Sequence, residues 1–305
     1  MLRYAIRRLI SSLLTLYLVI SLTFFLMQAV PGGPFLGDSV NPIVSQRLLE
    51  KYGYDKPLGQ QYIRYMSDLI HADLGNSMVD KAGKSVTSII GQYFPTTLRI
   101  GLLAIAAVIL LGIPLGVLAA VKHTSIFDRC FTLFASFFVS IPSFIMTVAM
   151  MLIFGAWLRI LPVAYLSDWK SYILPVAGMA INPLFGTARL TRTTMLDVTG
   201  QDYIKTARAK GLPTWKIMLK HALRNAVIPV VTSVGPMIAG ILTGSFVVEK
   251  VFAVAGIGKY YISSIGSRDY PLIMGTTIFF ALLLIFCNYI VDLLYGVIDP
   301  RIKLK

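Results

Sequence analysis

Six apolar stretches dominate this chain of 305 residues, at about 9–30, 100–121, 131–156, 172–188, 227–248 and 273–296. A helix needs roughly 20 apolar residues to cross about 30 Å of hydrocarbon. The composition agrees, because 56% of the residues are hydrophobic and only 14% are charged. The fourth stretch is the weakest, since it is short and carries Pro175, Asn182 and Pro183. The sequence therefore predicts an all-α polytopic membrane protein with six transmembrane helices.

The placement of Lys and Arg predicts the orientation of these helices. With a cytoplasmic N-terminus, the inner segments hold 16 basic residues in 64 positions, and the outer segments hold 12 in 108. This bias has the sign that the positive-inside rule requires. We therefore expect both termini in the cytoplasm and most of the net charge of +14 at the inner face, which disfavours a nucleic-acid binder.

Three units follow along the chain. Residues 1–30 form a cytoplasmic N-terminus and a first helix, which lacks an A-x-A cleavage site and is interpreted as retained. Residues 31–97 form a structured external cap, in which Tyr62, Met66 and Leu69 predict an amphipathic helix over 57–70. Residues 98–305 form the transmembrane core with a basic cytoplasmic loop at 199–226.

Glycines and prolines mark expected close contacts and bends within the spans. Small-residue pairs at Gly112 and Gly116, and at Gly240 and Gly244, predict close helix packing. The prolines at 114, 142, 229 and 236 mark candidate bends.

The residues that catalysis or metal binding needs are scattered. Cys130 and Cys287 lie within or beside apolar spans, and the three histidines fall in different loops, so neither a disulfide nor a metal site is expected. The glycines of AGIGKYY do not make a phosphate-binding loop, because Ala253 and Tyr260 occupy its first and last positions. We therefore expect no catalytic residues, no metal and no cofactor in this chain.

The loop at 199–226 reads as two helices that meet at Gly211, a residue that can adopt the left-handed conformation and end the first helix. Asp202 is the expected N-cap, and Tyr203, Ile204 and Ala207 share one face of the first helix. In the second helix, an apolar stripe and a basic stripe are expected; the apolar one consists of Trp215, Met218, Leu219, Ala222 and Ala226, and the basic one of Lys216, Lys220 and Arg224. Such a pair suits either a protein partner or the anionic inner leaflet.

Residues 205–224 resemble the cytoplasmic EAA loop of permease subunits from binding-protein-dependent ABC importers. Lys205, Thr206 and Ala207 occupy the E-A-A positions, Gly211 the glycine, and His221, Leu223 and Arg224 the I-x-L-P positions. The general pattern is met only at Ala207, Gly211 and Leu223.

Where the loop differs from the general pattern, it resembles one branch of the family. Its sequence DYIKTARAKGL, followed by HALRNAVIPV, is similar to that of the B-type permease subunit of oligopeptide, dipeptide and nickel importers. Other stretches agree: RYAIRRL, FFLMQAVPGGPF, ARLTRTTMLDV, GSFVVEKVFAVAGIGKYY, RDYP and VDLLYGVIDPRIK. The resemblance covers the whole chain, and PGGPF favours the oligopeptide members.

The resemblance implies a type I importer permease, a non-catalytic subunit in the bacterial inner membrane that transports oligopeptides; dipeptides and nickel chelates are the alternatives. Its implied partners are a second homologous permease, two cytoplasmic ATPases that bind the ATP, and an external peptide-binding protein. The helix at 201–213 would couple to an ATPase. The coupling residues are then Asp202, Tyr203, Lys205, Thr206, Ala207, Arg208, Lys210, Gly211, Leu212, Leu223 and Arg224.

An external gate is expected at Gly256 and Gly258, where span five leaves the membrane, because paired glycines permit a bend or a close approach. A plain tight turn is the alternative. Two rival functions are a polytopic membrane enzyme, which would need clustered acids, bases or ligands, and an ion-coupled carrier. Only Asp292 places an ionisable group within a predicted span, which disfavours the carrier.

Overall fold

The computed structural model describes residues 2–29, 46–47, 50, 52–164, 166–244 and 246–298. Within these ranges every regular element is helical, apart from one β-bridge between Asn76 and Ser85. The all-α class predicted from the apolar stretches is confirmed. The PGGPF stretch at 31–35 lies outside the described residues.

The helices follow the chain in a simple order. The α-helices of the first half are α1 (Leu2–Ala29), α3 (Leu58–Ile70), α4 (Val86–Ala107), α5 (Ile113–Val121), α6 (Ile126–Ser140) and α7 (Ser143–Met150). Those of the second half are α8 (Ile173–Thr199), α9 (Asp202–Ala209), α10 (Thr214–Lys216), α11 (Leu223–Gly244), α12 (Phe246–Val251), α13 (Ile257–Ser267) and α14 (Tyr270–Ile298). Wider π turns join several of them, namely η1 (Val108–Gly112), η2 (Met151–Trp157) and η4 (Ile217–Ala222), and η3 (Trp169–Tyr172) is a 3-10 turn.

The described helices account for the six predicted spans. Five continuous helical stretches are long and apolar enough to cross a membrane: Ile6–Ala29, Val86–Val121, Trp169–Thr199, Thr214–Val251 and Tyr270–Val291. The sixth is a pair, Ile126–Ser140 and Ser143–Trp157, bent by 103°. The bend falls at Pro142, one of the predicted bends, while the chain continues as helix through Pro183, Pro229 and Pro236.

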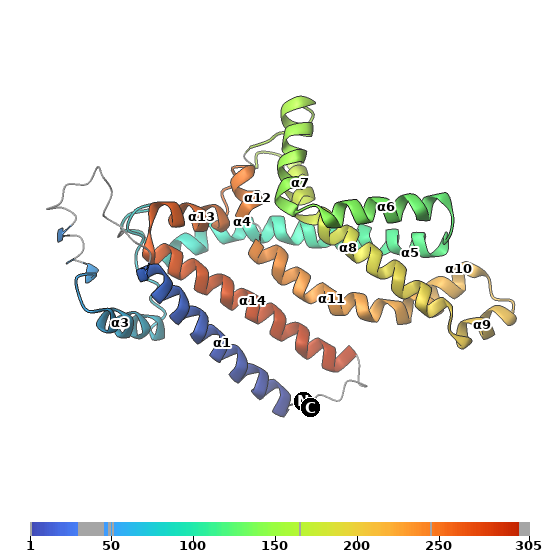
Figure 1. Cartoon of the computed structure of the whole chain (residues 1–305), viewed down its shortest axis with the longest axis horizontal. Coiled ribbons are helices and arrows are strands. Elements are labelled where there is room, and N and C mark those ends of the chain that lie inside the picture. Colours follow the sequence, from blue (N-terminus) through green and yellow to red (C-terminus); the bar gives the residue numbers. More distant parts are fainter. Residues whose placement is uncertain are drawn as a thin grey trace.

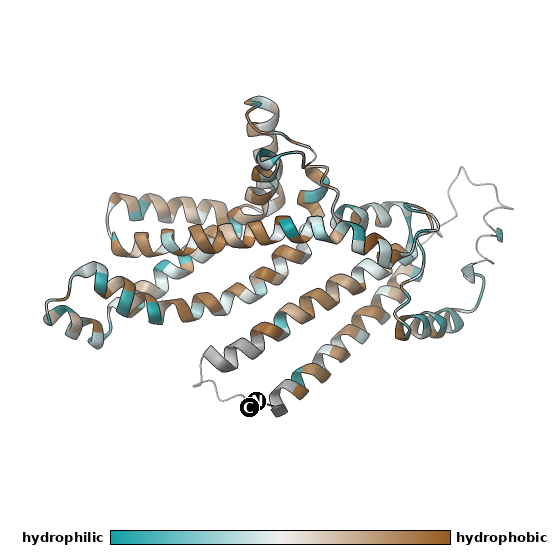
Figure 2. Cartoon of the chain, turned by 180° about the vertical axis from the view of Figure 1, so that it is seen from behind, coloured by the Kyte–Doolittle hydropathy of each residue, from teal (hydrophilic) through white to brown (hydrophobic). Residues whose placement is uncertain are grey.

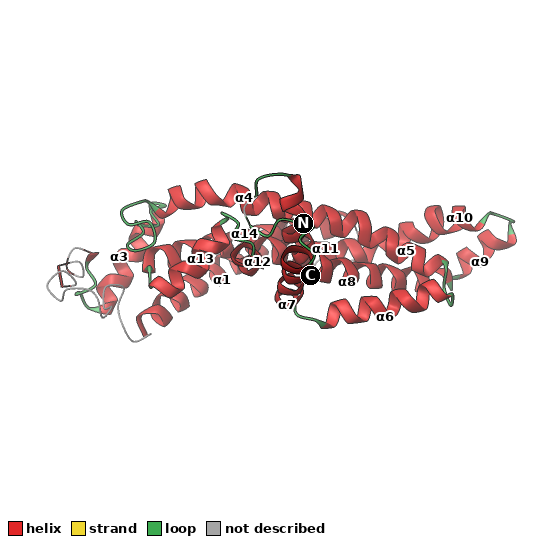
Figure 3. Cartoon of the chain, turned by 90° about the horizontal axis from the view of Figure 1, so that it is seen from above, coloured by secondary structure: helices red, strands yellow, loops and turns green. Residues whose placement is uncertain are grey.

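The molecule is elongated, with α3 near one end and α9 and α10 at the other (Figures 1 and 3). α8 lies at the centre of the bundle and packs against α4, α5, α6, α7 and α11. α1 packs beside α14 in the opposite direction, so the start of α1 and the end of α14 lie together (Figure 1). Hydropathy follows this arrangement, because hydrophilic residues gather on α3 and on the α9–α10 end while the long helices are mostly apolar (Figure 2).

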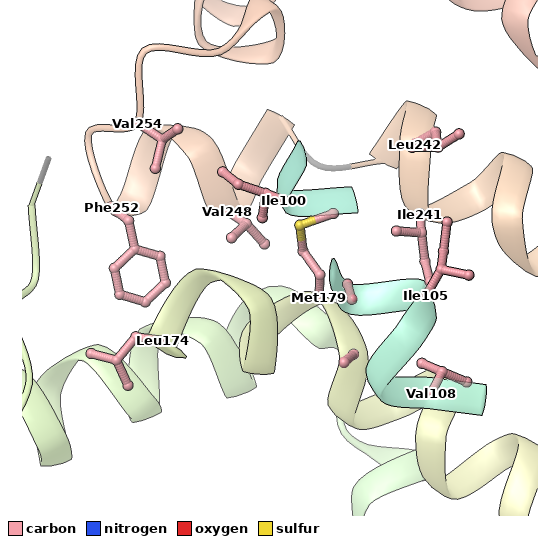
Figure 4. Packing of buried hydrophobic residues seen from close by; sticks show 12 residues of the cluster. Ile100, Ile105, Val108, Leu174, Met179, Ile241, Leu242, Val248, Phe252 and Val254 are labelled. Atoms are coloured by element: carbon pink, nitrogen blue, oxygen red, sulfur yellow. The ribbon is translucent and has the colours of Figure 1, made fainter. Parts of the chain in front are cut away.

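The main core forms where α4, α8, α11 and α12 meet (Figure 4). Ile100 of α4 and Leu174 of α8 are each only 1% exposed, and Phe252 closes the cluster at 2%. Figure 4 shows Leu174 close to Phe252 and Ile105 close to Ile241. This core holds the first turns of α8 against the second half of α4.

Glycine allows the close packing of α5 on α8 that the first small-residue pair predicts. A Cβ on Gly116 would lie 2.3 Å from the carbonyl oxygen of Ala188, and one on Gly112 would lie 3.0 Å from that of Leu184. The second predicted pair differs, because a Cβ on Gly240 would meet nothing within 4 Å. The surroundings of Gly244 are not among the described features of the chain.

The amphipathic helix predicted over 57–70 is confirmed as α3. Its Tyr62 hydroxyl lies 2.7 Å from the Ser21 hydroxyl of α1, and its ring stacks on Phe25 at 5.2 Å. α4 begins at Val86, so the last residues of the predicted external segment belong to the long second helix. Arg99, which the predicted boundary at 100 left outside the second span, therefore lies within the continuous helix 86–121.

Candidate functional site

The cytoplasmic loop predicted at 199–226 is the short helical end of the molecule, formed by α9, α10 and η4 (Figure 1). α8 runs eleven residues past the predicted end of the fourth span, to Thr199, and leads into α9 after two residues. The expectation that Asp202 caps α9 is wrong. Gln201 occupies the N-cap without a side-chain bond, and Asp202 is the first helical residue, where its negative charge favours the helix start.

Gly211 ends the first helix as predicted. α9 stops at Ala209, and Gly211 follows with a φ of +75°, the left-handed conformation that favours glycine. The Gly211 N–H donates to the Arg208 carbonyl at 3.0 Å, and the Leu212 N–H reaches the Ala207 carbonyl at 3.4 Å. A Cβ on Gly211 would meet nothing within 4 Å, so the glycine is required by its backbone angle and not by crowding.

The inner face of α9 rests on this chain itself. Ile204 is fully buried and Ala207 is 7% exposed. They pack in a cluster with Met195 of α8, Ala120 of α5 and Met218 of η4. Since the apolar face of α9 is covered by protein, that helix does not need lipid to bury it.

The second helix of the loop buries most of the predicted apolar stripe, because Met218, Ala222 and Ala226 are 7%, 0% and 1% exposed. The π turn η4 places Ile217 and Met218 side by side in the cluster, at 2% and 7% exposed. A π turn is wider than an α-helical turn, and Ile217, which the predicted stripe did not include, is buried within it. Trp215 and Leu219, both expected in the apolar stripe, are exposed at 67% and 53%.

A polar tether links the exposed side of α9 to the start of a membrane helix. Tyr203 was expected to share a face with Ile204 and Ala207, but unlike them it is exposed, at 43%, and its hydroxyl accepts a hydrogen bond of 2.7 Å from the Asn225 amide of α11. The Lys205 ammonium donates to the Asp202 carboxylate at 2.9 Å on the open surface. Movement of α9 is therefore connected to α11 by packing and by one direct bond.

Most of the predicted coupling residues are exposed at this end of the molecule. The exposed members are Asp202, Tyr203, Lys205, Thr206, Arg208, Lys210, Gly211 and Arg224; Leu212 and Leu223 are half-buried, and Ala207 is buried. The surface is strongly basic and also presents Trp215 and Leu219. Such a surface fits an acidic partner with an apolar pocket.

A buried ion pair next to this loop was missed from the sequence. The Arg192 guanidinium of α8 binds both oxygens of the Asp128 carboxylate, with Nε–Oδ1 at 2.5 Å and Nη2–Oδ2 at 2.8 Å. His123 Nδ1 lies 3.1 Å from the same carboxylate, and the Thr124 N–H donates to it at 3.1 Å. The pair fixes the α5–α6 turn to α8. Sequence reasoning could not find it, because its partners are 64 residues apart, although Arg192 lies in the ARLTRTT stretch.

The two glycines of the predicted gate lie against a buried carboxylate. Gly256 is the N-cap of α13, and its Cβ would lie 2.3 Å from Glu249 Oε2. A Cβ on Gly258 would lie 2.6 Å from the Phe246 Cα. The Glu249 carboxylate is 1% exposed and accepts a hydrogen bond from the Lys259 N–H at 3.2 Å. Both glycines therefore permit close approach, here to another segment of the same chain. Their role as a gate stays a prediction.

A second buried carboxylate, Asp269, holds the loop at residues 77–80, which belongs to the predicted external segment. Its side chain accepts hydrogen bonds from the Ser77 hydroxyl at 2.5 Å and from three successive backbone N–H groups, those of Met78, Val79 and Asp80, at 3.0–3.1 Å. Successive N–H groups that converge in this way form an anion-binding nest. The loop 77–80 is thereby fixed to the junction between α13 and α14. The RDYP stretch contains this residue, but nothing in the sequence identifies its partners.

Asp80 lies beside this nest and is poorly solvated. Burial raises the pKa of its carboxyl above the ordinary value of 3.8; the Asp269 carboxylate acts in the same direction, and hydrogen bonds from Ser267 and Ser263 oppose it. Nearby, burial and the hydrogen bond with Tyr93 raise the pKa of Tyr260 to about 12. Asp80, in the predicted external segment, is thus a carboxyl whose pKa lies above its usual range.

The described residues contain no group of three or more His, Cys, Asp or Glu side chains placed to hold a metal ion. Cys130 and Cys287 are both free thiols. The helix of Asp292 is described, but its side chain lies outside the described set.

Two sequence profiles match this chain and together cover nearly all of it. Residues 1–101 match the N-terminal component, and residues 112–304 the main component, of the binding-protein-dependent transport system inner membrane proteins. The chain is 43% identical over 305 residues to the dipeptide transport system permease protein DppB of Bacillus subtilis, covering 100% of this chain and 99% of the relative. It is 39% identical over 309 residues to the oligopeptide transport system permease protein OppB of Haemophilus influenzae, covering 99% and 100%.

Among solved structures, the inward-facing MetNI methionine ABC transporter is similar in fold. One of its chains superposes with a TM-score of 0.57 at 17% identity, covering 70% of this chain and 97% of that one.

Proposed function

The chain belongs to the family of binding-protein-dependent transport system inner membrane components, and we propose that it is the transmembrane permease subunit of an ATP-driven oligopeptide importer. It is a multi-pass protein of the bacterial inner membrane, and it supplies a transport pathway and not a catalytic site. The observation that carries this proposal is the match of relatives named as peptide permeases along the entire chain. Membership of this family also removes the two rivals, a polytopic enzyme and an ion-coupled carrier.

Peptides are the favoured substrate class. The choice that follows is between dipeptides and longer oligopeptides. A relative named for dipeptides and one named for oligopeptides are similarly close to this chain. The dipeptide reading is therefore the second candidate, and the nickel-chelate reading is third because both of these relatives are named for peptides.

The chain works with an ATPase, an external binding protein and a second permease. In the proposed assembly, a homologous permease completes the pathway, two cytoplasmic ATPases bind and hydrolyse the ATP, and both termini of this chain lie in the cytoplasm. The basic surface of α9 would sit in an ATPase groove with an acidic rim, as its exposed Lys205, Arg208 and Lys210 favour.

The proposed mechanism uses α9 as a rigid lever. ATP-driven closure of the ATPases moves α9, and the movement reaches the membrane helices through three connections: the cluster around Ile204, the Tyr203–Asn225 bond to α11, and the Asp128–Arg192 pair between α8 and the α5–α6 turn. Differential binding of this surface by the ATPase in its two states then shifts the pathway between inward-open and outward-open forms.

Uptake in a strain that lacks this gene tests the proposal. We expect the strain to lose uptake of a radiolabelled tetrapeptide, and the purified chain to bring ATPase subunits with it. Proteoliposomes of the complex should then take up the tetrapeptide only with ATP and loaded binding protein. Loss of dipeptide uptake alone would favour the second candidate, and unchanged uptake of both peptides with reduced nickel accumulation would refute the peptide assignment.

A further inference from the structure

Arg99 lies on the side of α4 that points away from the core, within the helical stretch 86–121 that is apolar enough to cross the membrane. The next residue, Ile100, is 1% exposed and belongs to the main core, so the core face of α4 points away from Arg99. Figure 4 shows Ile100 among the core residues, close to Met179 and Val248. Arg99 is exposed, together with Leu102 and Leu103 on the same side of the helix.

Arg99 lies at the edge of an open apolar groove between α4 and the start of α8. The groove has a volume of about 660 Å³ and is lined by Arg99, Leu103, Trp169, Tyr172, Ile173 and Val176. Trp169 is 72% exposed, so most of its indole is available to an occupant. The Arg99 guanidinium donates one hydrogen bond, of 3.3 Å, to the Tyr172 hydroxyl. Among the described residues, no carboxylate pairs with it.

The position of this cation limits what can cover the groove. Contact with hydrocarbon is unfavourable for an arginine within a membrane-spanning stretch, so such residues generally face a water-filled cavity or pair with another polar group. Guanidinium has five N–H donors in a planar fork, and Tyr172 uses only one of them. The remaining donors fit a planar anion with two oxygens, which is the geometry of a carboxylate.

We propose that this groove contacts the C-terminal carboxylate of the peptide during its passage, with Arg99 as the anion-binding residue and Tyr172 holding its guanidinium in place. The inference rests on the proposed function. It gives a pathway that must accept many peptide sequences one chemical group that all of them share. Every unmodified peptide ends in a carboxylate, whatever its side chains. The apolar walls at Leu103, Trp169 and Val176 accept the last side chain by contact alone.

Transport of paired peptides by the assembled importer tests the proposal. A tetrapeptide with a free C-terminus and its C-terminal amide are each supplied at concentrations that saturate the binding protein, as measured on that protein alone. Because a hydrogen bond to a charged group is worth ~1.5–3 kcal/mol, Arg99→Gln should slow uptake of the free peptide at least about tenfold, and uptake of the amide less than twofold. Arg99→Lys should keep an intermediate rate, because it retains the charge but not the fork. Arg64→Gln, which removes an exposed cation elsewhere on the outer side, should leave both rates unchanged.

A second measurement does not depend on how the binding protein treats the amide. A cysteine replacing Leu103 is labelled with a thiol reagent in the complex, with and without peptide-loaded binding protein. We expect the free peptide to protect this cysteine when Arg99 is present and not when it is Gln.

The outcomes separate the possible occupants of the groove. If Arg99→Gln slows both peptides equally, or abolishes assembly with the second permease, the arginine contacts that partner or a lipid phosphate and the proposal is wrong. Equal rates for the variant and the parent would also overturn it. If the unmodified complex transports neither peptide, the proposed function itself has failed, which is a different result.

Discussion

Gly211→Val provides the sharpest test of the coupling loop, because the structure isolates a single cause for its effect. Gly211 has a φ of +75°, and a Cβ placed there meets nothing within 4 Å. The substitution therefore introduces backbone strain without a collision. A non-glycine residue in this conformation costs about 1–3 kcal/mol, and a β-branched residue lies at the upper end.

That strain is comparable to the free energy that α9 gains by packing against the rest of the chain. Fully burying an isoleucine is worth roughly 1.5–3 kcal/mol, and a methyl group adds ~0.8 kcal/mol; Ile204 and Ala207 are the two buried residues of α9. A cost of 1–3 kcal/mol changes an equilibrium by about 5- to 150-fold. Gly211→Val should thus displace α9 in a large fraction of molecules while the membrane helices stay folded.

The assay is ATP hydrolysis by the purified complex in proteoliposomes. We expect basal hydrolysis to persist, whereas its stimulation by loaded binding protein and the accompanying peptide uptake should fall at least about fivefold. Gly211→Asn is the matched control, because asparagine tolerates the left-handed conformation. Gly200→Ala is a second control in the same loop, at an ordinary φ of −78°. Equal stimulation in the Val and Asn variants would refute the reasoning and would favour a loop that only rests on the inner leaflet.

Three further predictions concern the remaining polar contacts. Arg192→Gln leaves the buried Asp128 carboxylate without its ion pair and should destabilise the complex by about 3 kcal/mol, measured by thermal unfolding; most of this loss should be absent in a background that already carries Asp128→Asn. Tyr203→Phe removes the bond from Asn225 and should reduce stimulated hydrolysis with little change in melting temperature, whereas an equal effect on basal hydrolysis would contradict a role in transmission. Asp80→Asn should raise the melting temperature slightly at pH 7, because a raised pKa means that the ionised carboxyl opposes folding; this gain should shrink as the pH falls toward 4, and a gain that grows on acidification would contradict the assignment.

Features that depend on local sequence could be predicted well. The spans follow from the length of apolar stretches, α3 follows from the spacing of Tyr62, Met66 and Leu69, and the end of α9 follows from the conformational freedom of Gly211. Proline at 142 correctly marks a bend, but its angle of 103° depends on packing that no local pattern contains.

Features that depend on contacts between distant segments could not be predicted. The buried face of the second loop helix was predicted only in part, because Trp215 and Leu219 are exposed and Ile217, in the π turn η4, is buried. The glycines at 256 and 258 were recognised, but their neighbour Glu249 was not. Residue identity alone does not reveal that α9 is bonded to α11 through Asn225, since the hydrogen bond joins residues 22 positions apart.

The Asp269 nest has a consequence for how this protein is made. The loop at 77–80, in the predicted external segment, donates its N–H groups to a side chain synthesised about 190 residues later. At ~5–20 residues per second, the ribosome needs about 10–40 s to make that stretch. In the predicted orientation, the loop is outside the membrane during this time and has no acceptor. An insertion intermediate that stops before residue 269 should therefore expose residues 77–80 to external protease, and cleavage there should cease once α13 and the start of α14 have emerged.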